Sequence, residues 1–263
     1  MLFKREKTSC GIDLTSPSIP WVILRQQSRQ LSLQAIGEGL QVIHAKKIYT
    51  VVANHQIMAK EITLPVAMSD ADIEDYLQLL SSEVFMLSPE LLVFDFYSLP
   101  DNHIKAYATR KNDIIKQQSL LQNYQIKANS IEPEQHALLR VYRFHNLTHE
   151  LSLFIHCCHD HLQLYVIEQD EIIFYHQFIC EHHADAITIT ARLQEAWHHY
   201  HGKTPGQVFI SGDYRQEIMR SGQHFFNTKI QLFNPFKKMD EKLNHGKFTL
   251  AIGLALRGCH VKH

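Results

Sequence analysis

Apolar and polar side chains alternate along two arms of a stretch in the middle of the chain, LSLFIHCCHDHLQLYVI (151–167). Alternation with a period of two is typical of a strand with one buried face, so the stretch predicts a β-hairpin whose arms belong to the core. Its polar centre, HCCHDH (156–161), is the predicted tip. A tip that approaches phosphate groups normally uses Gly, which lets backbone N–H groups come close. Here the tip carries imidazoles and thiols instead.

The N-terminal region has a similar pattern. Thr8–Leu14 and Ile19–Arg25 read as strands on either side of a turn at Thr15–Ser18. Two hairpins of this kind, one in each half of the chain, suggest a duplicated fold. Other β-rich runs predict strands over 31–36, 46–53, 56–64, 91–97, 103–110, 128–131, 171–179, 208–210 and 229–232.

The apolar spacing changes to a helical period after Pro65. Ser69 and Asp72 have the spacing of a capping-box variant, and apolar residues at helical spacing follow through Phe85. Pro133 is suited to the first position of another helix. The spacing predicts helices over 69–85, 113–124, 133–144, 183–201, 214–221 and 248–257, the last of them ended by Gly258.

Composition and charge exclude several classes of protein. With 263 residues and 45% hydrophobic content the chain is globular, and a net charge of −1 without a basic run argues against direct nucleic-acid binding. We find neither a secretory signal nor about 20 consecutive apolar residues, so we expect a cytoplasmic protein. Five cysteines, an odd number, argue against a disulfide framework.

Several segments, taken in order, resemble the PilM family of type IV pilus assembly proteins, and within it the competence protein A branch. GIDLTSPSIPWVIL is similar to the family's first phosphate hairpin, and AKEITLPVAMSDADIEDYLQLLSSEVF to its lysine, Leu-Pro and acidic-helix segment. LLVFDFYSLPDN, ANSIEPEQHALLRVYRF and VFISGDYRQ resemble the Asp-Tyr strand, the start of the second half and the adenosine-side turn. IQLFNPFKKM and FTLAIGLALRG resemble the closing segments. The resemblance covers almost the whole chain.

The resemblance implies an actin-like α/β fold with two RNase H-like halves around a nucleotide cleft. It places the first half at 1–126, with an α/β subdomain inserted at about 57–125, and the second half at 127–263 with a reduced subdomain. It further implies a scaffold of a DNA-uptake pilus machine that grips the N-terminal tail of a PilN-like bitopic protein. The chain would then lie at the cytoplasmic face of the bacterial inner membrane, held there through its partner.

This chain departs from the family pattern where ATP chemistry would take place. Asp13 is retained, whereas the Asp of the second hairpin, which would orient Mg²⁺ or water, is lost. The departures remove a Lys, an Asp and glycines that serve phosphate binding: Thr15 for Gly, Pro20 for Lys, His156 for Asp, Cys158 for Gly and Asp213 for Gly. The chain is also shorter than the family between Arg25 and Lys46 and between Glu181 and His201.

We therefore expect a degenerate actin-like protein, without catalytic residues and without a cofactor. The alternative is a weak actin-like ATPase with ATP and magnesium in the cleft. The vestigial nucleotide residues would be Asp13, Thr15, Ser16, Ser211, Gly212 and Gly253. Asp13 has a second reading, as a turn residue that bonds its own backbone.

The His- and Cys-rich tip also invites a zinc interpretation, with His156, His159, His161, Cys157 and Cys158 as candidates. Structural zinc sites usually pair ligands from two separate knuckles, whereas adjacent cysteines in a strand point to opposite faces. We therefore expect no metal site. Free buried Cys usually behaves as a small apolar residue, which also argues against a Cys157 nucleophile.

For the partner tail we expect binding through main-chain hydrogen bonds to a strand edge at His103–Arg110, with apolar pockets beneath. The expected contact residues are Phe94, Phe96, Ala106, Tyr107 and Thr109. The alternative is that the aromatic side chains only close the core of the insert. The acidic helix at 70–83 offers a second possible docking face for a basic partner, although a solvated charged surface is the better explanation.

Overall fold

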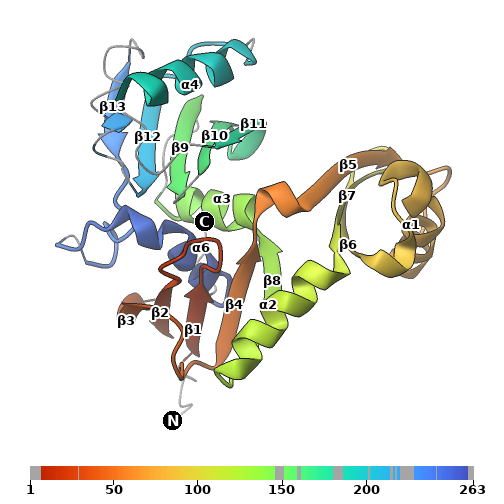
Figure 1. Ribbon diagram of the computed structural model, residues 1–263, viewed down its shortest axis with the longest axis horizontal. Helices are drawn as coiled ribbons and strands as arrows, with labels where there is room; N and C mark the ends of the chain where they lie inside the picture. The colour runs from red at the N-terminus through yellow and green to blue at the C-terminus, as the bar shows by residue number, and fades with distance from the viewer. Residues whose placement is uncertain are drawn as a thin grey trace. The chain divides into compact units, whose positions relative to one another are not determined.

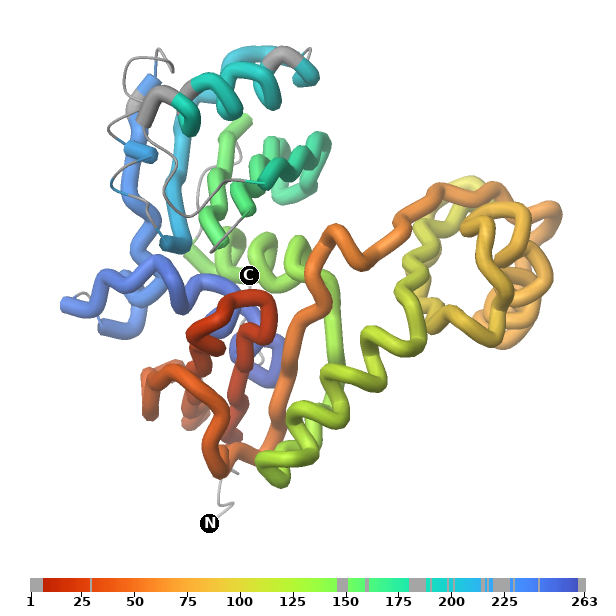
Figure 2. The backbone as a smooth tube through the Cα atoms, viewed as in Figure 1, coloured from red at the N-terminus to blue at the C-terminus, as the bar shows by residue number. Residues whose placement is uncertain are grey.

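A computed structural model describes residues 7–28, 30–145, 151–158, 161–179, 186–200, 202–213, 216, 218–219, 228–240 and 242–259. The chain separates into two compact units, one formed by residues up to Val51 together with those from Asn129 onward, and one formed by Val52–Ala128. Figure 2 traces how the chain leaves the first unit after strand β4 (Lys47–Val52), passes through the second, and returns to strand β8 (Ser130–Pro133).

The first unit contains two five-stranded sheets with the same topology (Figure 1). Their orders are β3-β2-β1-β4-β8 and β11-β10-β9-β12-β13. The first has β1 (Lys7–Ile12), β2 (Pro20–Gln27), β3 (Gln30–Glu38), β4 (Lys47–Val52) and β8 (Ser130–Pro133). The second has β9 (Ser152–Cys158), β10 (His161–Glu168), β11 (Glu171–Ile179), β12 (Gln207–Gly212) and β13 (Lys229–Leu232).

Each sheet begins with an antiparallel meander of three strands, followed by a strand parallel to the first. β1 pairs antiparallel with β2 and parallel with β4, and β9 pairs antiparallel with β10 and parallel with β12. The two hairpins predicted from alternating apolar residues are confirmed, and so is the duplicated fold. In physical terms, each period-2 pattern supplies one strand face to a core, and the same pattern occurs in both halves.

Two helices join the halves, α3 (Glu134–Phe144) after β8 and α6 (Thr249–Arg257), which follows the short 3₁₀ turn Gly246–Phe248. One hydrophobic core contains side chains of both helices and of both sheets, among them Tyr49, Val141, Phe154 and Leu254. Pro133 is the last residue of β8 and caps α3 rather than lying inside it, so its predicted helical position is wrong. The fixed φ of proline suits an extended residue as well as the first residue of a helix, and Pro133 is extended, with φ −60° and ψ 141°.

A second core covers the other face of the second sheet, where α4 (Ala186–His198) packs. It includes Leu153, Ile155, Leu164 and Leu193. The helix predicted at 214–221 falls mostly outside the described residues. Residues 183–185, at the start of the predicted fourth helix, are outside them as well.

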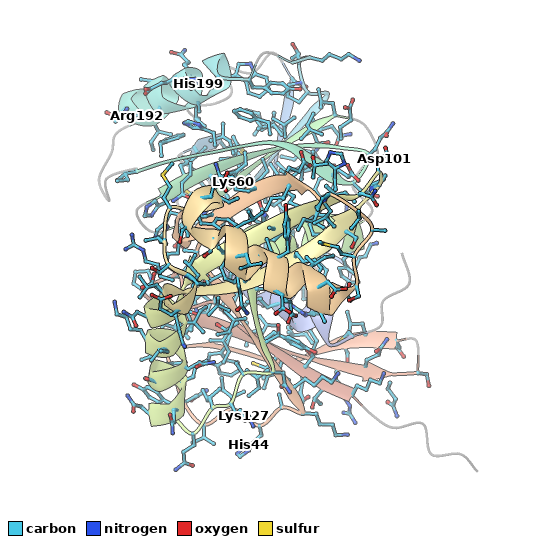
Figure 3. All side chains as sticks on the ribbon, turned by 90° about the vertical axis from the view of Figure 1, so that its right-hand side faces the viewer. His44, Lys60, Asp101, Lys127, Arg192 and His199 are labelled. Atoms are coloured by element: carbon cyan, nitrogen blue, oxygen red, sulfur yellow. The ribbon has the colours of Figure 1, made fainter. Side chains whose placement is uncertain are left out.

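The Val52–Ala128 unit is a three-stranded antiparallel sheet with helices. Its elements are the 3₁₀ turn Asn54–Gln56, β5 (Ile57–Thr63), α1 (Asp70–Val84), the 3₁₀ turn Pro89–Leu91, β6 (Leu92–Leu99), β7 (His103–Arg110) and α2 (Lys111–Asn123). The predicted capping box at Ser69 and Asp72 is present on α1. The turn between β6 and β7 has positive φ at Asp101 and Asn102, 58° each, a backbone region that Asp and Asn adopt more often than other side chains; Figure 3 labels Asp101.

Candidate functional site

The turn of the first hairpin is organised by Asp13, whose carboxylate is buried just beyond β1. Its Oδ1 accepts hydrogen bonds from the backbone N–H of Thr15 at 2.9 Å and from the Thr15 hydroxyl at 2.6 Å. The Ser16 and Ser18 hydroxyls are 3.2 Å apart in the same turn. The polar groups of the predicted first phosphate loop therefore contact one another.

Burial raises the pKa of Asp13 to about 7, against the lowering effect of the two Thr15 hydrogen bonds. The Glu134 carboxyl raises it further. Glu134 is the first residue of α3, is also buried, and accepts a 2.8 Å hydrogen bond from Gln163 Nε2. Two carboxyl groups thus share a desolvated region, which disfavours ionisation of Asp13.

Asp13→Asn is expected to remove a pH dependence of stability. Because the pKa of Asp13 rises from 3.8 to about 7 on folding, the native state holds a proton that the unfolded chain releases between those values, so this residue weakens the fold as pH rises through that window. The free energy of unfolding of the Asn variant minus that of the wild type should increase by on the order of 2 kcal/mol from roughly pH 5 to pH 7. Urea unfolding at several pH values measures it.

The difference between the two proteins isolates Asp13. His145 and His156 have pKa values lowered to about 4, mainly by burial, so they destabilise the fold as pH falls, but they do so equally in both proteins. A difference that stays flat with pH would show that Asp13 is ionised in the native state.

The second hairpin differs from the prediction at its tip. His156, Cys157 and Cys158 belong to β9 and His161 to β10, with Cys158 opposite His161 in the register. The predicted tip is therefore wrong for residues 156–158 and 161, which lie in strands, and residues 159–160, His159 among them, lie outside the described residues. His156 and Cys158 lie on one face of β9, at the end of the sheet where the other polar groups described below also lie.

His156 is buried, and its Nδ1 has no hydrogen-bond partner among the described residues. Cys157 belongs to the core shared with α4, while Cys158 has the opposite strand parity. Burial raises the pKa of the Cys158 thiol well above 9, and Glu134, Asp13 and Asp213 add to that effect. A neutral imidazole and a neutral thiol therefore stand where the family pattern has an Asp and a Gly.

The end of β12 supplies Ser211 and Gly212. The Ser211 hydroxyl lies 2.5 Å from the Thr249 hydroxyl, at the start of α6. Gly212 has φ +88° and lies against the backbone of Cys157, and Asp213 N–H donates to the Cys157 carbonyl at 2.8 Å. The turn after β12 is thereby tied to the second hairpin.

Of the six predicted nucleotide residues, Gly253 lies apart from the turns. It is within α6, where its Cα faces the backbone of Ala137 in α3 and allows the two helices to approach closely. Asp13, Asp213 and Glu134, which come from the two turns and the start of α3, all raise the pKa of the Cys158 thiol. Glu134 was not among the predicted site residues. The only sign of it in the sequence is an acidic residue directly after Pro133. Among the described residues, no group of three His, Cys, Asp or Glu side chains could hold a metal ion.

The partner residues predicted in the insert are divided between two faces of its sheet. β7 is the central strand, paired with β5 on one side and β6 on the other, so the predicted free edge at His103–Arg110 is wrong. Strand order depends on tertiary pairing and cannot be read from the β7 sequence. Phe94, Phe96 and Ala106 pack with the core under α1.

Tyr107 and Thr109 have the same strand parity as each other and the opposite parity to Ala106. The Tyr107 ring lies 6.1 Å from that of Tyr97, and the Thr109 hydroxyl donates to the Gln56 carbonyl at 3.0 Å. The structure therefore brings Tyr107 together with Tyr97 of β6, a residue absent from the predicted set.

No family model matches the sequence. No curated protein matches it at a significant level either. Solved structures do: the chain is similar to a "PilM-PilN type IV pilus biogenesis complex" at a TM-score of 0.77 and 13% identity, over 97% of this chain and 99% of that one.

Two further structures show the same fold at lower similarity. One is a Bacteroides thetaiotaomicron protein with an actin-like ATPase fold and unknown function, at a TM-score of 0.53 and 13% identity over 89% of this chain and 94% of that one. The other is the cytoplasmic domain of EpsL, an inner-membrane component of the Vibrio cholerae type II secretion system, at 0.54 and 10% identity over 97% and 96%. The chain has the actin-like α/β fold, as its sequence motifs predicted.

No helix within the described ranges combines the length and apolar character needed to cross a membrane.

Proposed function

We propose that the chain is a scaffold of a type IV pilus-like machine and that it binds the N-terminal cytoplasmic tail of a PilN-like inner-membrane protein. The observation that carries this proposal is the similarity to the PilM-PilN complex over 97% of the chain. The similarity to a cytoplasmic secretion domain points the same way. We place the protein at the cytoplasmic face of the inner membrane, in a machine for DNA uptake; the order of motifs shared with the competence protein A branch favours this role.

We further propose that this scaffold works without hydrolysing ATP and without a bound cofactor. The hydroxyls of Thr15 and Ser211 are engaged by Asp13 and Thr249. Gly212 and Gly253 are used for close approach between segments of the chain itself. Phosphate binding needs several donors directed at the ligand together with a cation, and these contacts leave few for it.

For the tail we propose the face of the insert sheet that carries Tyr97 and Tyr107, next to the edge strand β6. Val93 and Tyr97 lie on that face of β6 with Asp95 between them, and they are 40% and 43% exposed, which is high for residues of this size. An extended peptide adds to a strand edge through main-chain hydrogen bonds, and its alternate side chains contact exposed apolar residues of this spacing.

Tyr97→Ala is expected to weaken binding of a synthetic peptide with the tail sequence of the PilN-like protein from the same genome. If Tyr97 is a central contact of the tail, its truncation should cost more than about 1 kcal/mol, as for other tyrosines that dominate an interface, so we expect a loss of affinity of about tenfold, with thermal stability nearly unchanged. Fluorescence anisotropy with labelled peptide measures it. Leu79→Ala, an exposed position of α1, is the matched control and should bind as the wild type does.

Equal affinity of the Tyr97→Ala and wild-type proteins would contradict this placement of the tail. Absence of binding to the wild type would contradict the proposed partner. The same protein is titrated with magnesium and ATP by calorimetry. Micromolar affinity there would favour the alternative, an actin-like ATPase that the fold also permits.

A further inference from the structure

A cavity of about 310 Å³ lies between α3 and the end of α6, away from the hairpin turns. Positive charge dominates its lining: Arg140 and Arg143 from α3 and Arg257 from α6, with His136 beside them. Apolar side chains complete it, Leu139, Phe144, Leu256 and Cys259. His136, Arg140 and Arg143 follow the i, i+4, i+7 spacing of one helix face, so α3 presents a basic stripe to the cavity.

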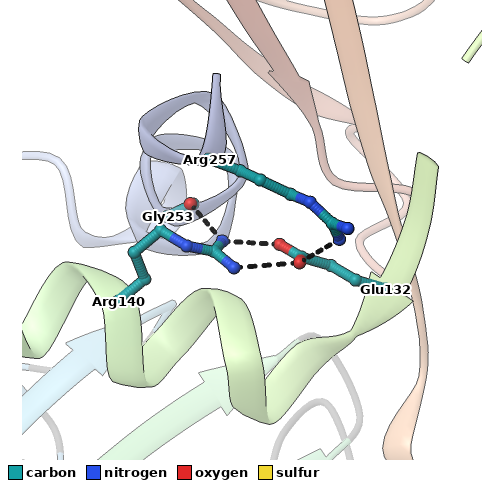
Figure 4. A network of polar contacts seen from close by, with 4 residues as sticks. All are labelled: Glu132, Arg140, Gly253 and Arg257. Carbon is teal, nitrogen blue, oxygen red and sulfur yellow. Dashed lines mark hydrogen bonds and ion pairs between the residues drawn. The ribbon is translucent and has the colours of Figure 1, made fainter. Parts of the chain in front are cut away.

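Glu132 is the acidic partner of two of these arginines (Figure 4). Arg140 forms two hydrogen bonds to its carboxylate, at 2.6 and 2.9 Å, and a third to the Gly253 carbonyl at 2.8 Å. Arg257 contacts the same carboxylate at 2.6 Å. One carboxylate therefore holds two guanidinium groups in fixed positions, and a positive charge remains.

Arg143 adds to that excess. Its guanidinium donates twice to the backbone carbonyl of Asp170, at 3.2 and 2.6 Å, and forms no ion pair within the described part of the chain. A guanidinium has five N–H donors, so two bonds to a neutral carbonyl orient Arg143 while three donors stay available. Three guanidinium groups against one carboxylate leave two net positive charges around a partly apolar cavity.

We propose that this cavity is a second docking site of the scaffold, and that it accepts a short acidic segment of a protein partner in which carboxylates alternate with apolar side chains. Planar guanidinium groups bind carboxylates through paired hydrogen bonds. Leu139, Phe144 and Leu256 would contact the apolar side chains of the segment. The site belongs to the unit with the two five-stranded sheets, so it is independent of the tail site proposed on the insert.

The helix ends favour a peptide over a phosphate compound. Phe144 and Arg257 are the last residues of α3 and α6, so part of the cavity lining comes from C-terminal helix ends, which carry partial negative charge. That negative potential repels a compact polyanion more strongly than it repels single carboxylates that are each paired with an arginine. Phosphate sites instead use helix N-termini and glycine amides, and this lining contains no glycine.

Arg143→Gln tests the proposal because Arg143 is outside the Glu132 network. The probe is a short fluorescent peptide of alternating Asp or Glu with Leu or Phe, and its matched control peptide carries Asn and Gln instead. We expect the full chain to bind only the acidic peptide, with affinity that falls as salt rises. Arg143→Gln should weaken binding by about tenfold. Arg143→Lys, which keeps the charge, should lose less, and Arg192→Gln on α4 should lose nothing.

Equal binding of both peptides, or equal affinity of the Arg143→Gln and wild-type proteins, would overturn the proposal. Inorganic pyrophosphate is the competitor that separates the ligand classes. If pyrophosphate displaces the peptide with an inhibition constant well below the Kd of the peptide, the cavity would be assigned to phosphate ligands instead. Thermal unfolding of each variant shows whether the fold is intact, and His136→Gln serves as a second cavity variant if Arg143→Gln does not fold.

Discussion

Glu132→Gln is expected to lower the free energy of unfolding by about 3 kcal/mol, the lower end of the range for removing one partner of a buried ion pair. Only 3% of the Glu132 side chain is exposed, and it holds both Arg140 and Arg257. The neutral amide would leave two guanidinium groups facing each other without a counter-charge. The lower end applies because these arginines are partly exposed, 24% and 40%, and can recover some hydration.

The control is the same substitution in an exposed pair. Glu195 lies 2.9 Å from Arg192 on α4, and both side chains are more than half exposed. Exposed pairs contribute little, so Glu195→Gln should change stability by less than about 1 kcal/mol. Urea unfolding of both variants gives the comparison, and similar losses for the two would contradict the structural role assigned to Glu132.

Gly212→Ala is the second substitution with a large expected effect, a loss of about 3 kcal/mol or more. Its φ of +88° is one that side chains rarely adopt, and an added Cβ would lie 2.7 Å from the Cys157 carbonyl carbon and closer still to its oxygen. Left-handed backbone costs about 1–2 kcal/mol for an L-residue. Overpacking against backbone atoms adds about 1–3 kcal/mol, because the paired strands β9 and β12 cannot yield as a flexible side chain would.

Gly39→Ala separates the two contributions. Gly39 has φ +75°, yet a Cβ there meets nothing within 4 Å. This variant should show only the backbone penalty, about 1–2 kcal/mol. Thermal or urea unfolding measures both variants, and a Gly212→Ala protein no less stable than Gly39→Ala would contradict the tight contact between the adenosine-side turn and Cys157.

Local patterns predicted the elements of this fold well because they depend on neighbouring residues. The alternation around 151–167 gave the second hairpin, and Ser69 with Asp72 gave the start of α1. The pattern predicted too long a hairpin tip, because polar residues usually face solvent. His156 is buried in a strand, where it stands opposite Gln163 and Ser211, and no local rule distinguishes that position from a turn.

Features that depend on distant segments could not be predicted. The central position of β7 follows from its pairing with β5 and β6, which flank a strand whose own sequence reads the same at an edge. The Glu132 network joins residues separated by up to 125 positions. Each of its members looks like an ordinary charged residue of a helix end or strand, so the arginine-lined cavity carries no sequence signature.

The position of the insert has a consequence for how the protein folds. β4 and β8 are neighbours in the first sheet, and Asn129 is bonded to Ile48 through its N–H and its side chain, at 2.7 Å each. Residues 52–128 thus occupy the place of a single connection, which the second half makes with 213–228. Closing the longer connection, even if disordered, costs only on the order of 1 kcal/mol more in entropy. Destabilising substitutions in the insert therefore need not unfold the unit that contains the two five-stranded sheets. The insert and that unit can diverge in sequence at different rates.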